Sequence, residues 1–403
     1  MLDRRSILKT AFAAGAASLW DAPLKLAFAR APTDRRFVVV ILRGALDGLA
    51  AVPPYGDPDY ASVRGRLALD ANGLGAPLNL DGQFGLHPSL AGMKAMWDAH
   101  ELAVFHNIAS PYRDRSHFDG QDVLESGGVR PNSLSDGWLN RALLPLGFGG
   151  GEAALAIAAT PPLLLSGPAK VSSWMPSQIP EPDAQFLERV RALYAGDPVL
   201  AGALDRALGT EAQADAAMDD KPAGQKDKPA AYGNLVPLFA GAAHLLARDD
   251  GPRIAVLDAS GWDTHVNEGA ADGQLARRLA ALDAGLSAMK TSLGDSWAKT
   301  AIVMATEFGR TVRPNGNGGT DHGTGAAAFL FGGAVAGGRV HAEWVGLKPE
   351  ALKDGRDLPP RSDLRALFKA ALADHLHLPR RDLDSSVFPD SANVPPMTDL
   401  IST

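Results

Sequence analysis

Cysteine is absent from the 403 residues of the chain. Its absence excludes disulfides, zinc–cysteine sites, iron–sulfur clusters and thiol nucleophiles. A bound metal would therefore need ligands from Asp, Glu, His, Asn or hydroxyl groups. No basic run accompanies the net charge of -7, which argues against nucleic acid as the main partner. After residue 31 no apolar stretch approaches the ~20 residues of a membrane helix, so no stable membrane span is expected.

Three familiar catalytic patterns are also missing: the G-x-S-x-G elbow, the P-loop and the H-E-x-x-H helix. The composition is otherwise that of a globular protein, with 46% hydrophobic and 21% charged residues. Length and composition allow one large α/β domain over residues 32–403 or two smaller ones. The single domain is the one expected, because no internal repeat is found.

The amino terminus has the features of an export signal. Arg4 and Arg5 precede a weakly apolar run over residues 10–20, and Ala27-Phe28-Ala29 gives a small-x-small cleavage site. This order predicts a twin-arginine signal peptide over residues 1–31, export by the twin-arginine translocase and a periplasmic or secreted mature protein. The alternative is an amphipathic helix that stays attached to the mature chain.

Apolar, β-branched runs alternate with amphipathic stretches along the chain. The runs predict strands at residues 37–42, 102–108, 254–257, 300–305 and 326–331. The amphipathic spacing predicts helices at residues 87–99, 116–125, 273–293 and 363–376, the last with Ser362 as its N-cap. Such alternation predicts an α/β fold: a mostly parallel sheet with helices on both faces.

Two regions interrupt this alternation. Residues 152–182 contain short apolar pieces among prolines, which favours a hairpin or an inserted cap. Residues 211–231 are charged and poor in large apolar side chains, which predicts a flexible surface insertion.

Polar clusters follow the predicted strands, at the edge where open parallel sheets place their sites. They comprise Asp47 and the segments 113–119, 258–265, 306–310 and 315–323. Because these five loops come to one edge of the sheet, we expect their side chains to share a site.

The segment Asp263-Thr264-His265 favours metal binding if it is extended, because alternate side chains of extended backbone point to one face. His322, among glycines, offers a second imidazole. Asp47, Glu307 and Asp321 complete a set of oxygen and nitrogen ligands that zinc, manganese or calcium accepts. In the alternative interpretation, the carboxylates cap turns and the histidines bond backbone carbonyls.

Ser116 lies at the predicted start of a helix, where it acts either as an N-cap or as a nucleophile. The same position surrounds its oxygen with backbone N–H groups and the positive end of the helix dipole. Arg113 and Arg115 are placed to hold an anionic group. Together with His117, these residues form the candidate catalytic set.

Five motifs, taken in order, resemble one family. They are LRGALDGLAAVPPYGD, RSHFDGQDVLESG, GWDTH, TEFGR and DHGTGAAAFLFGG. Over residues 37–377 the chain resembles the twin-arginine-exported bacterial family of domain of unknown function 1501. That family is grouped with the alkaline phosphatase and sulfatase superfamily. The resemblance therefore implies an alkaline phosphatase-like fold and hydrolysis of a phosphate or sulfate ester at one or two divalent ions.

Carried over by motif, the resemblance implies a metal-ligand role for Asp47, Asp263, His265, Glu307 and His322, and a nucleophile at Ser116. Two departures make a full two-metal site unexpected. Phe308 stands where the superfamily usually has a histidine, and Arg43-Gly44 separates the first strand from its aspartate. The expected partner is a small anionic ester or a surface polymer. The alternative is a non-catalytic exported binding protein that keeps the fold with a degenerate metal site.

Overall fold

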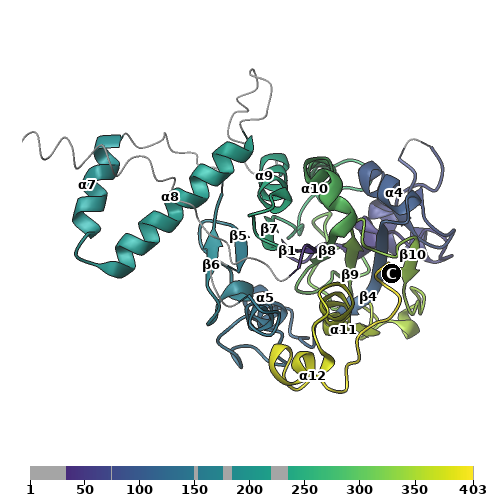
Figure 1. Cartoon of the computed structure of the whole chain (residues 1–403). Coiled ribbons are helices and arrows are strands. Elements are labelled where there is room, and N and C mark those ends of the chain that lie inside the picture. Colours follow the sequence, from purple (N-terminus) through teal and green to yellow (C-terminus); the bar gives the residue numbers. More distant parts are fainter. Residues whose placement is uncertain (1–32, 74, 149–152, 176–183, 219–234, 403) are drawn as a thin grey trace, which may run out of the picture.

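The computed structural model describes residues 33–73, 75–148, 153–175, 184–218 and 235–402. Its centre is a nine-stranded sheet (Figure 1). The strands in spatial order are β10 (Arg339–His341), β4 (Leu102–Ala109), β9 (Ala326–Phe331), β8 (Thr300–Ala305), β1 (Arg36–Arg43), β7 (Ile254–Ser260), β5 (Ala154–Ile157) and β6 (Val171–Ser173), with β11 (Ser362–Asp363) beside β4.

All strand pairings of this sheet are parallel except those of β9, which runs antiparallel to both β4 and β8. The amino end of β9 therefore lies at the same edge as the carboxyl ends of its neighbours. This reversal brings the polar loop before β9 to the edge where parallel sheets place their sites.

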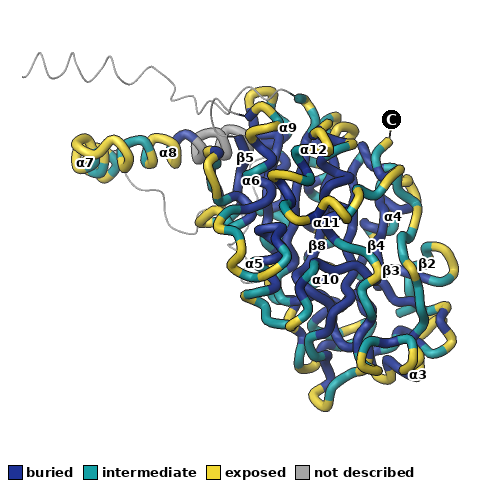
Figure 2. The backbone as a smooth tube through the Cα atoms, turned by 90° about the horizontal axis from the view of Figure 1, so that it is seen from below, coloured by how far each residue is buried: buried dark blue, intermediate teal, exposed yellow. Residues whose placement is uncertain are grey.

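Helices cover both faces of the sheet because its central strands are apolar on both sides. Val38, Val40 and Leu42 of β1 pack in one core, and the alternate residues Phe37 and Val39 pack in the other. The first core is covered by α4 (Ala91–Asp98), α9 (Val236–Ala247) and α10 (Gln274–Leu293). The second is covered by α5 (His117–Ser126), α6 (Trp138–Leu143) and α11 (Leu364–Ala370). Figure 2 shows the strands β4 and β8 in the dark blue of buried residues, inside the fold. The predicted fold class is confirmed.

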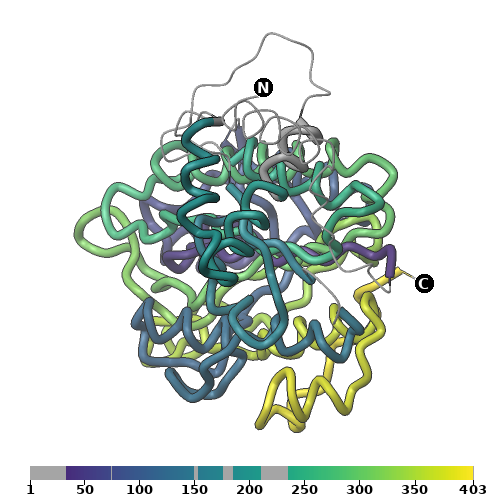
Figure 3. Tube along the Cα trace, turned by 60° about the vertical axis from the view of Figure 1, so that its left-hand side comes forward, coloured from purple at the N-terminus to yellow at the C-terminus, as the bar shows by residue number. Residues whose placement is uncertain are grey.

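Shorter elements complete the domain. They are α2 (Gly48–Ala51), α3 (Tyr60–Arg64), α12 (Arg380–Asp382) and the two-stranded sheet of β2 (Leu78–Asn79) and β3 (Gly85–Leu86). The helix predicted over 363–376 begins one residue later than expected: Asp363 caps it, accepting from the Arg365 N–H at 2.8 Å. It passes into a π-helical turn at Ala371–His375, where His375 hydrogen-bonds the Arg36 carbonyl. In Figure 3 the yellow carboxyl-terminal segment accordingly runs beside the purple start of β1.

The cap expected at 152–182 is wrong for its described part, residues 153–175. Ala154–Ile157 and Val171–Ser173 instead extend the main sheet as β5 and β6, with β5 parallel to β7. The physical reason is burial: all four residues of β5 are buried in the sheet's two cores. Short apolar pieces between prolines thus form the last two strands on one side of the sheet.

Two helices, α7 (Ala184–Tyr194) and α8 (Pro198–Met218), project from the body next to α9 (Figures 1 and 2). The expected flexible insertion at 211–231 is helical over 211–218, in keeping with its alanine and glutamine content. Residues 219–231 and the predicted signal peptide, 1–31, lie outside the described residues. Within the described ranges, we find no helix with both the length and the apolarity to cross a membrane.

Candidate metal centre

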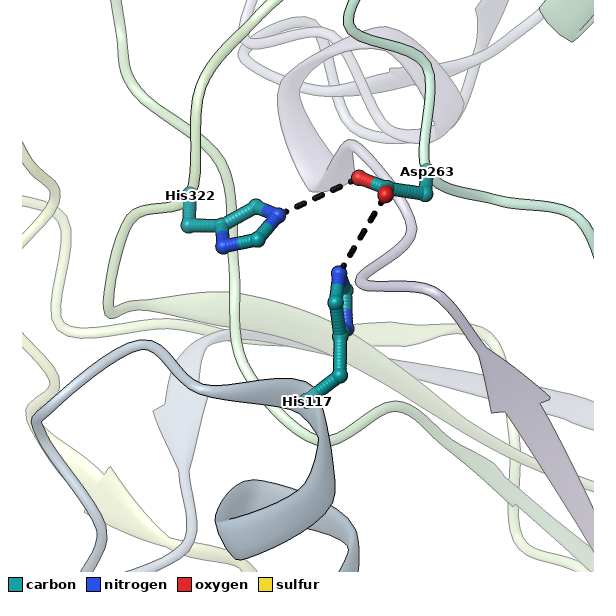
Figure 4. Close-up of side chains that lie close together, drawn as sticks. All are labelled: His117, Asp263 and His322. Atoms are coloured by element: carbon teal, nitrogen blue, oxygen red, sulfur yellow. Dashed lines mark hydrogen bonds and ion pairs between the residues drawn. The ribbon is translucent and has the colours of Figure 1, made fainter.

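Three loops bring a carboxylate and two imidazoles together at the carboxyl edge of the sheet (Figure 4). His117 opens α5 after β4, Asp263 follows β7, and His322 precedes the antiparallel β9. One ligand atom from each lies within 4.8 Å of the others. This group can hold a metal ion.

The Asp263 carboxylate is at the centre of the group. Its Oδ2 lies 3.4 Å from His117 Nε2, and its Oδ1 lies 3.2 Å from His322 Nε2. His265 adds a third imidazole, with Nε2 3.0 Å from Asp263 Oδ1 and 2.9 Å from His322 Nε2. The four side chains are 24–42% exposed, so solvent and small solutes reach them. We refer to these four residues as the His–Asp cluster.

Side chains of the Asp263–His265 segment alternate between two faces, as predicted for extended backbone. Asp263 and His265 point into the His–Asp cluster. Thr264 points the other way, is fully buried, and donates from its hydroxyl to Glu268 Oε2 at 2.8 Å. Gly319 packs directly on this segment, since a Cβ there would lie 2.1 Å from the Thr264 carbonyl oxygen. Glycine therefore lets the loop before β9 approach the loop after β7.

Each imidazole of the cluster is oriented by an oxygen acceptor at Nδ1. His117 Nδ1 bonds Glu307 Oε1 at 2.7 Å, His322 Nδ1 bonds the Arg115 carbonyl at 2.9 Å, and His265 Nδ1 lies 3.3 Å from Asp321 Oδ1. Because carbonyl and carboxylate oxygens only accept, the neutral rings carry their hydrogen on Nδ1. Their Nε2 lone pairs then all face Asp263, the arrangement typical of metal-binding histidines.

Without a cation these groups are poorly matched. His117 Nε2 is buried and has no hydrogen-bond partner, and the His265 and His322 Nε2 atoms face one another. Zinc bonds of 2.0–2.2 Å in tetrahedral geometry place ligand atoms roughly 3.3 Å apart. The separations of Asp263 from His117 and His322, 3.4 and 3.2 Å, are close to that spacing. The residues fit a divalent ion held by nitrogen and oxygen.

The charges agree with this fit. Burial alone would raise the pKa of Asp263, but the Arg310 guanidinium, 2.5 Å from Oδ1, lowers it below its usual value. Burial lowers the pKa of His322, whereas the hydrogen bond to Glu307 raises the pKa of His117. The cluster thus combines an ionised carboxylate with a His322 ring that favours its neutral form, which is the form that ligates.

A family model described as "Protein of unknown function (DUF1501)" matches residues 97–385. The chain belongs to this family. The matched region contains all four residues of the His–Asp cluster, and the family predicted from the five sequence motifs is confirmed. A search of curated proteins returns no match for this DUF1501 chain.

Several solved structures are similar to it. The phosphonate monoester hydrolase of Agrobacterium radiobacter shares 12% identity over 86% of this chain and 74% of that one, with a TM-score of 0.33. The C-terminal periplasmic domain of EcEptC from Escherichia coli, in complex with Zn, shares 9% identity over 76% of each chain at a TM-score of 0.35. Ps i-CgsB in complex with k-i-k-neocarrahexaose shares 11% identity over 90% of this chain and 78% of that one at 0.39.

Glu307 and Asp321 lie behind the cluster, where they orient its histidines. Glu307 is fully buried; its Oε1 accepts from His117 and from the Gly44 N–H at 2.9 Å, and its Oε2 from the Thr306 hydroxyl at 2.9 Å. Burial raises the pKa of Glu307, but these hydrogen bonds, led by the one from His117, lower it overall. The structure therefore places both carboxylates next to imidazoles, not among the atoms that face the ion site.

Asp47 does not join the cluster of this DUF1501 chain. It is 1% exposed and caps α2, where Oδ1 accepts from the N–H groups of Leu49 and Ala50. Its Oδ2 accepts from Arg64 at 2.7 Å. Asp47 was expected to be a metal ligand, and that expectation is wrong. The turn at residues 43–46 places Asp47 beyond the sheet edge, and both of its carboxylate oxygens accept hydrogen bonds from other groups.

The two arginines of the candidate catalytic set turn away from the cluster. Arg113 donates to the carbonyls of its own loop, at Ser110 and Tyr112. Arg115 pairs with the fully buried Asp357 at 2.6 Å, while its carbonyl fixes His322. The expectation that these guanidiniums hold an anion at the cluster is therefore wrong for this conformation. Their position next to Ser116 in the sequence did not show that carbonyl and carboxylate acceptors close to each guanidinium take up its hydrogen bonds.

Ser116 occupies the N-cap position of α5, directly before His117. Its hydroxyl makes no capping hydrogen bond, and its backbone N–H donates to the Tyr112 hydroxyl at 3.0 Å. Of the two interpretations of Ser116, capping by its side chain is not the one observed. The hydroxyl remains available beside the cluster residue His117.

Two residues hold the cluster in place, a role that the sequence did not indicate for either of them. Arg310 is 2% exposed and donates to four carbonyls, those of Gly44, Ala45, Trp262 and Thr320, as well as to Asp263. Phe308 packs against the rings of His117 and His322, with centroids 5.0 and 5.1 Å away. Both lie in the TEFGR motif, so the motif marked the loop, but nothing in it distinguishes a buried arginine from an exposed one.

Proposed function

We propose that this DUF1501 protein is an exported, divalent-metal-dependent hydrolase of phosphate or sulfate esters. The observation that carries the proposal is the set of three imidazole Nε2 atoms around the Asp263 carboxylate, each ring oriented at Nδ1. When bound, a divalent ion supplies a Lewis acid for a phosphoryl or sulfuryl oxygen. The fold adds support, since the cluster lies at the carboxyl edge of a mostly parallel sheet.

Zinc is the ion that the ligand types favour. Imidazole nitrogens suit zinc, and His117, His322 and the Asp263 carboxylate give the three protein ligands of a site that keeps one position open. Calcium takes six to eight oxygen ligands, which three histidines and Asp263 do not offer. Manganese, which prefers oxygen ligands, is the weaker alternative.

Ser116 is the proposed nucleophile. Its oxygen attacks the phosphorus or sulfur atom, the alcohol of the ester leaves, and water then releases the acid from the serine. The proton lost by the serine hydroxyl balances the proton taken up by the departing alcohol. Support comes from the unused hydroxyl at the start of the ten-residue helix α5, whose dipole favours an anionic group at this end.

The test combines metal analysis with a turnover screen on the purified full chain. We expect about one zinc per chain and hydrolysis of an aryl phosphate or aryl sulfate, abolished by a chelator. Ser116→Ala should lower kcat by at least about a thousandfold, as removal of a nucleophile does elsewhere. Ser133→Ala is the matched control and should keep wild-type turnover, because this serine is exposed and its hydroxyl donates to the Arg130 carbonyl.

Each other outcome selects an alternative. Full activity in Ser116→Ala assigns the attack to a water molecule and leaves the serine a structural role. Metal binding without turnover on either ester class, or neither metal nor turnover, contradicts the enzyme and favours a binding protein with a degenerate site.

Export belongs to the same proposal and rests on the sequence of residues 1–31. In a bacterial host, the processed chain should be recovered from the periplasmic fraction or the medium. Replacing Arg4 and Arg5 by lysine should leave the full-length precursor in the cytoplasm. Recovery of the altered chain in the periplasm at the wild-type level argues against the twin-arginine route.

A further inference from the structure

A cavity of about 420 Å³ opens directly beside the His–Asp cluster. Two of its lining residues, Asp263 and His265, belong to the cluster itself. The other walls come from the chain that follows, Val266 and Asn267, and from the first turn of α10, Gln274 and Arg277. A group bound at the cluster therefore has an adjoining space that leads toward α10.

The lining of this cavity includes a cation. Arg277 is the one positively charged side chain of the lining, and no acidic side chain other than Asp263 contributes to it. Arg277 is exposed, and among the described residues its guanidinium has no hydrogen bond or ion pair. An unpaired guanidinium binds carboxylate, phosphate or sulfate oxygens with two parallel hydrogen bonds.

The remaining walls suit the body of an organic molecule. Val266 is 50% exposed and gives an apolar surface, while Asn267 and Gln274 offer neutral hydrogen-bonding groups. Arg277 also stands in the first turn of the twenty-residue helix α10, whose dipole adds positive potential at that end. The cavity thus borders the proposed metal site, a mixed wall and a free cation.

We propose that this cavity is a subsite for a second anionic group on the substrate. The substrate would be an ester whose alcohol portion carries a further carboxylate, phosphate or sulfate, which Arg277 binds while the reacting group lies at the His–Asp cluster. This inference rests on the proposed function. Both a small diacidic ester and a polymer with repeated anionic groups present this chemistry.

The test measures binding to the zinc-loaded full chain by calorimetry, without requiring turnover. The probes are ω-phosphonocarboxylates of increasing chain length, each compared with the alkylphosphonate of the same length. At the length that spans the cavity, we expect the added carboxylate to tighten binding about fivefold, the range of a solvent-exposed charge pair. Arg277→Gln should remove this gain and leave alkylphosphonate binding unchanged. Arg313→Gln, an exposed arginine outside the cavity lining, should keep the gain.

Two results separate failure of the subsite from failure of the enzyme. If alkylphosphonates bind and the carboxylate gives no gain at any length, or if Arg277→Gln keeps the gain, the subsite is overturned while the proposed function stands. If no phosphonate binds the zinc-loaded protein, the proposed function fails and the subsite fails with it. To distinguish the sources, a small phosphorylated hydroxy acid and an anionic polysaccharide ester then compete for the same probe.

Discussion

Replacing Asp263 by asparagine is expected to lower the affinity for zinc at least about a hundredfold and to abolish ester hydrolysis. Asp263 is the carboxylate that all three Nε2 atoms of the His–Asp cluster approach, at 3.0–3.4 Å. Asparagine keeps the shape but removes the negative charge. Even removal of an orienting partner typically costs 10–100-fold in metal affinity, so loss of a ligand should cost more. Competition with a chromophoric chelator measures the affinity.

Two controls make this result specific. Asp321→Asn, which touches the cluster only through His265 Nδ1, should weaken zinc binding about tenfold. The metal-free Asp263→Asn protein should unfold within about 1 kcal/mol of the metal-free wild type, because Arg310 keeps its four carbonyl acceptors and Asp263 is 42% exposed. Wild-type zinc affinity in Asp263→Asn would mean that the cluster is not the metal centre.

The sequence predicted which loops meet, but less well which side chains face inward. Asp263, His265 and His322 come together as expected, because extended alternation and a sheet edge constrain them. His117 was expected as a catalytic residue and lies among the same atoms. Asp47 was expected there too, yet a short turn was enough to bury it against Arg64. The extent to which a loop side chain is buried depends on tertiary packing, which the local spacing of residues does not encode.

The fold, like the site, was predicted only in part from the sequence. Long buried strands such as β1 and β8 are visible as continuous apolar runs, and their helices as amphipathic stretches. The reversal of β9 was not foreseen, because strand direction depends on the connection and not on the run itself. Strands β5 and β6 were missed because four and three residues are too short for a periodic signal.

A buried group of charges joins the cluster loops to α2 and α3. Arg64 is fully buried, and its Nη2 lies 2.7 Å from Asp47 Oδ2 and 3.7 Å from Glu268 Oε1. Glu268 accepts on Oε2 from the hydroxyls of Thr264 and Thr320, which belong to the loops after β7 and before β9. Burial and the nearby Asp47 raise the pKa of Glu268 to about 8. One arginine thus connects α2 and α3 to both loops of the metal centre.

Replacing Arg64 by methionine is therefore expected to destabilise the protein by about 3–5 kcal/mol, the usual cost of leaving a buried charge without its partner. Urea unfolding of the metal-free proteins measures the change, with Arg66→Gln, an exposed neighbour, as a control expected within about 0.5 kcal/mol of the wild type. Adding Asp47→Asn to Arg64→Met should recover part of the loss, because asparagine still caps α2 but carries no charge. If Arg64→Met alone unfolds at the wild-type urea concentration, the Asp47 charge does not depend on Arg64, and the two loops are held by their backbone contacts instead.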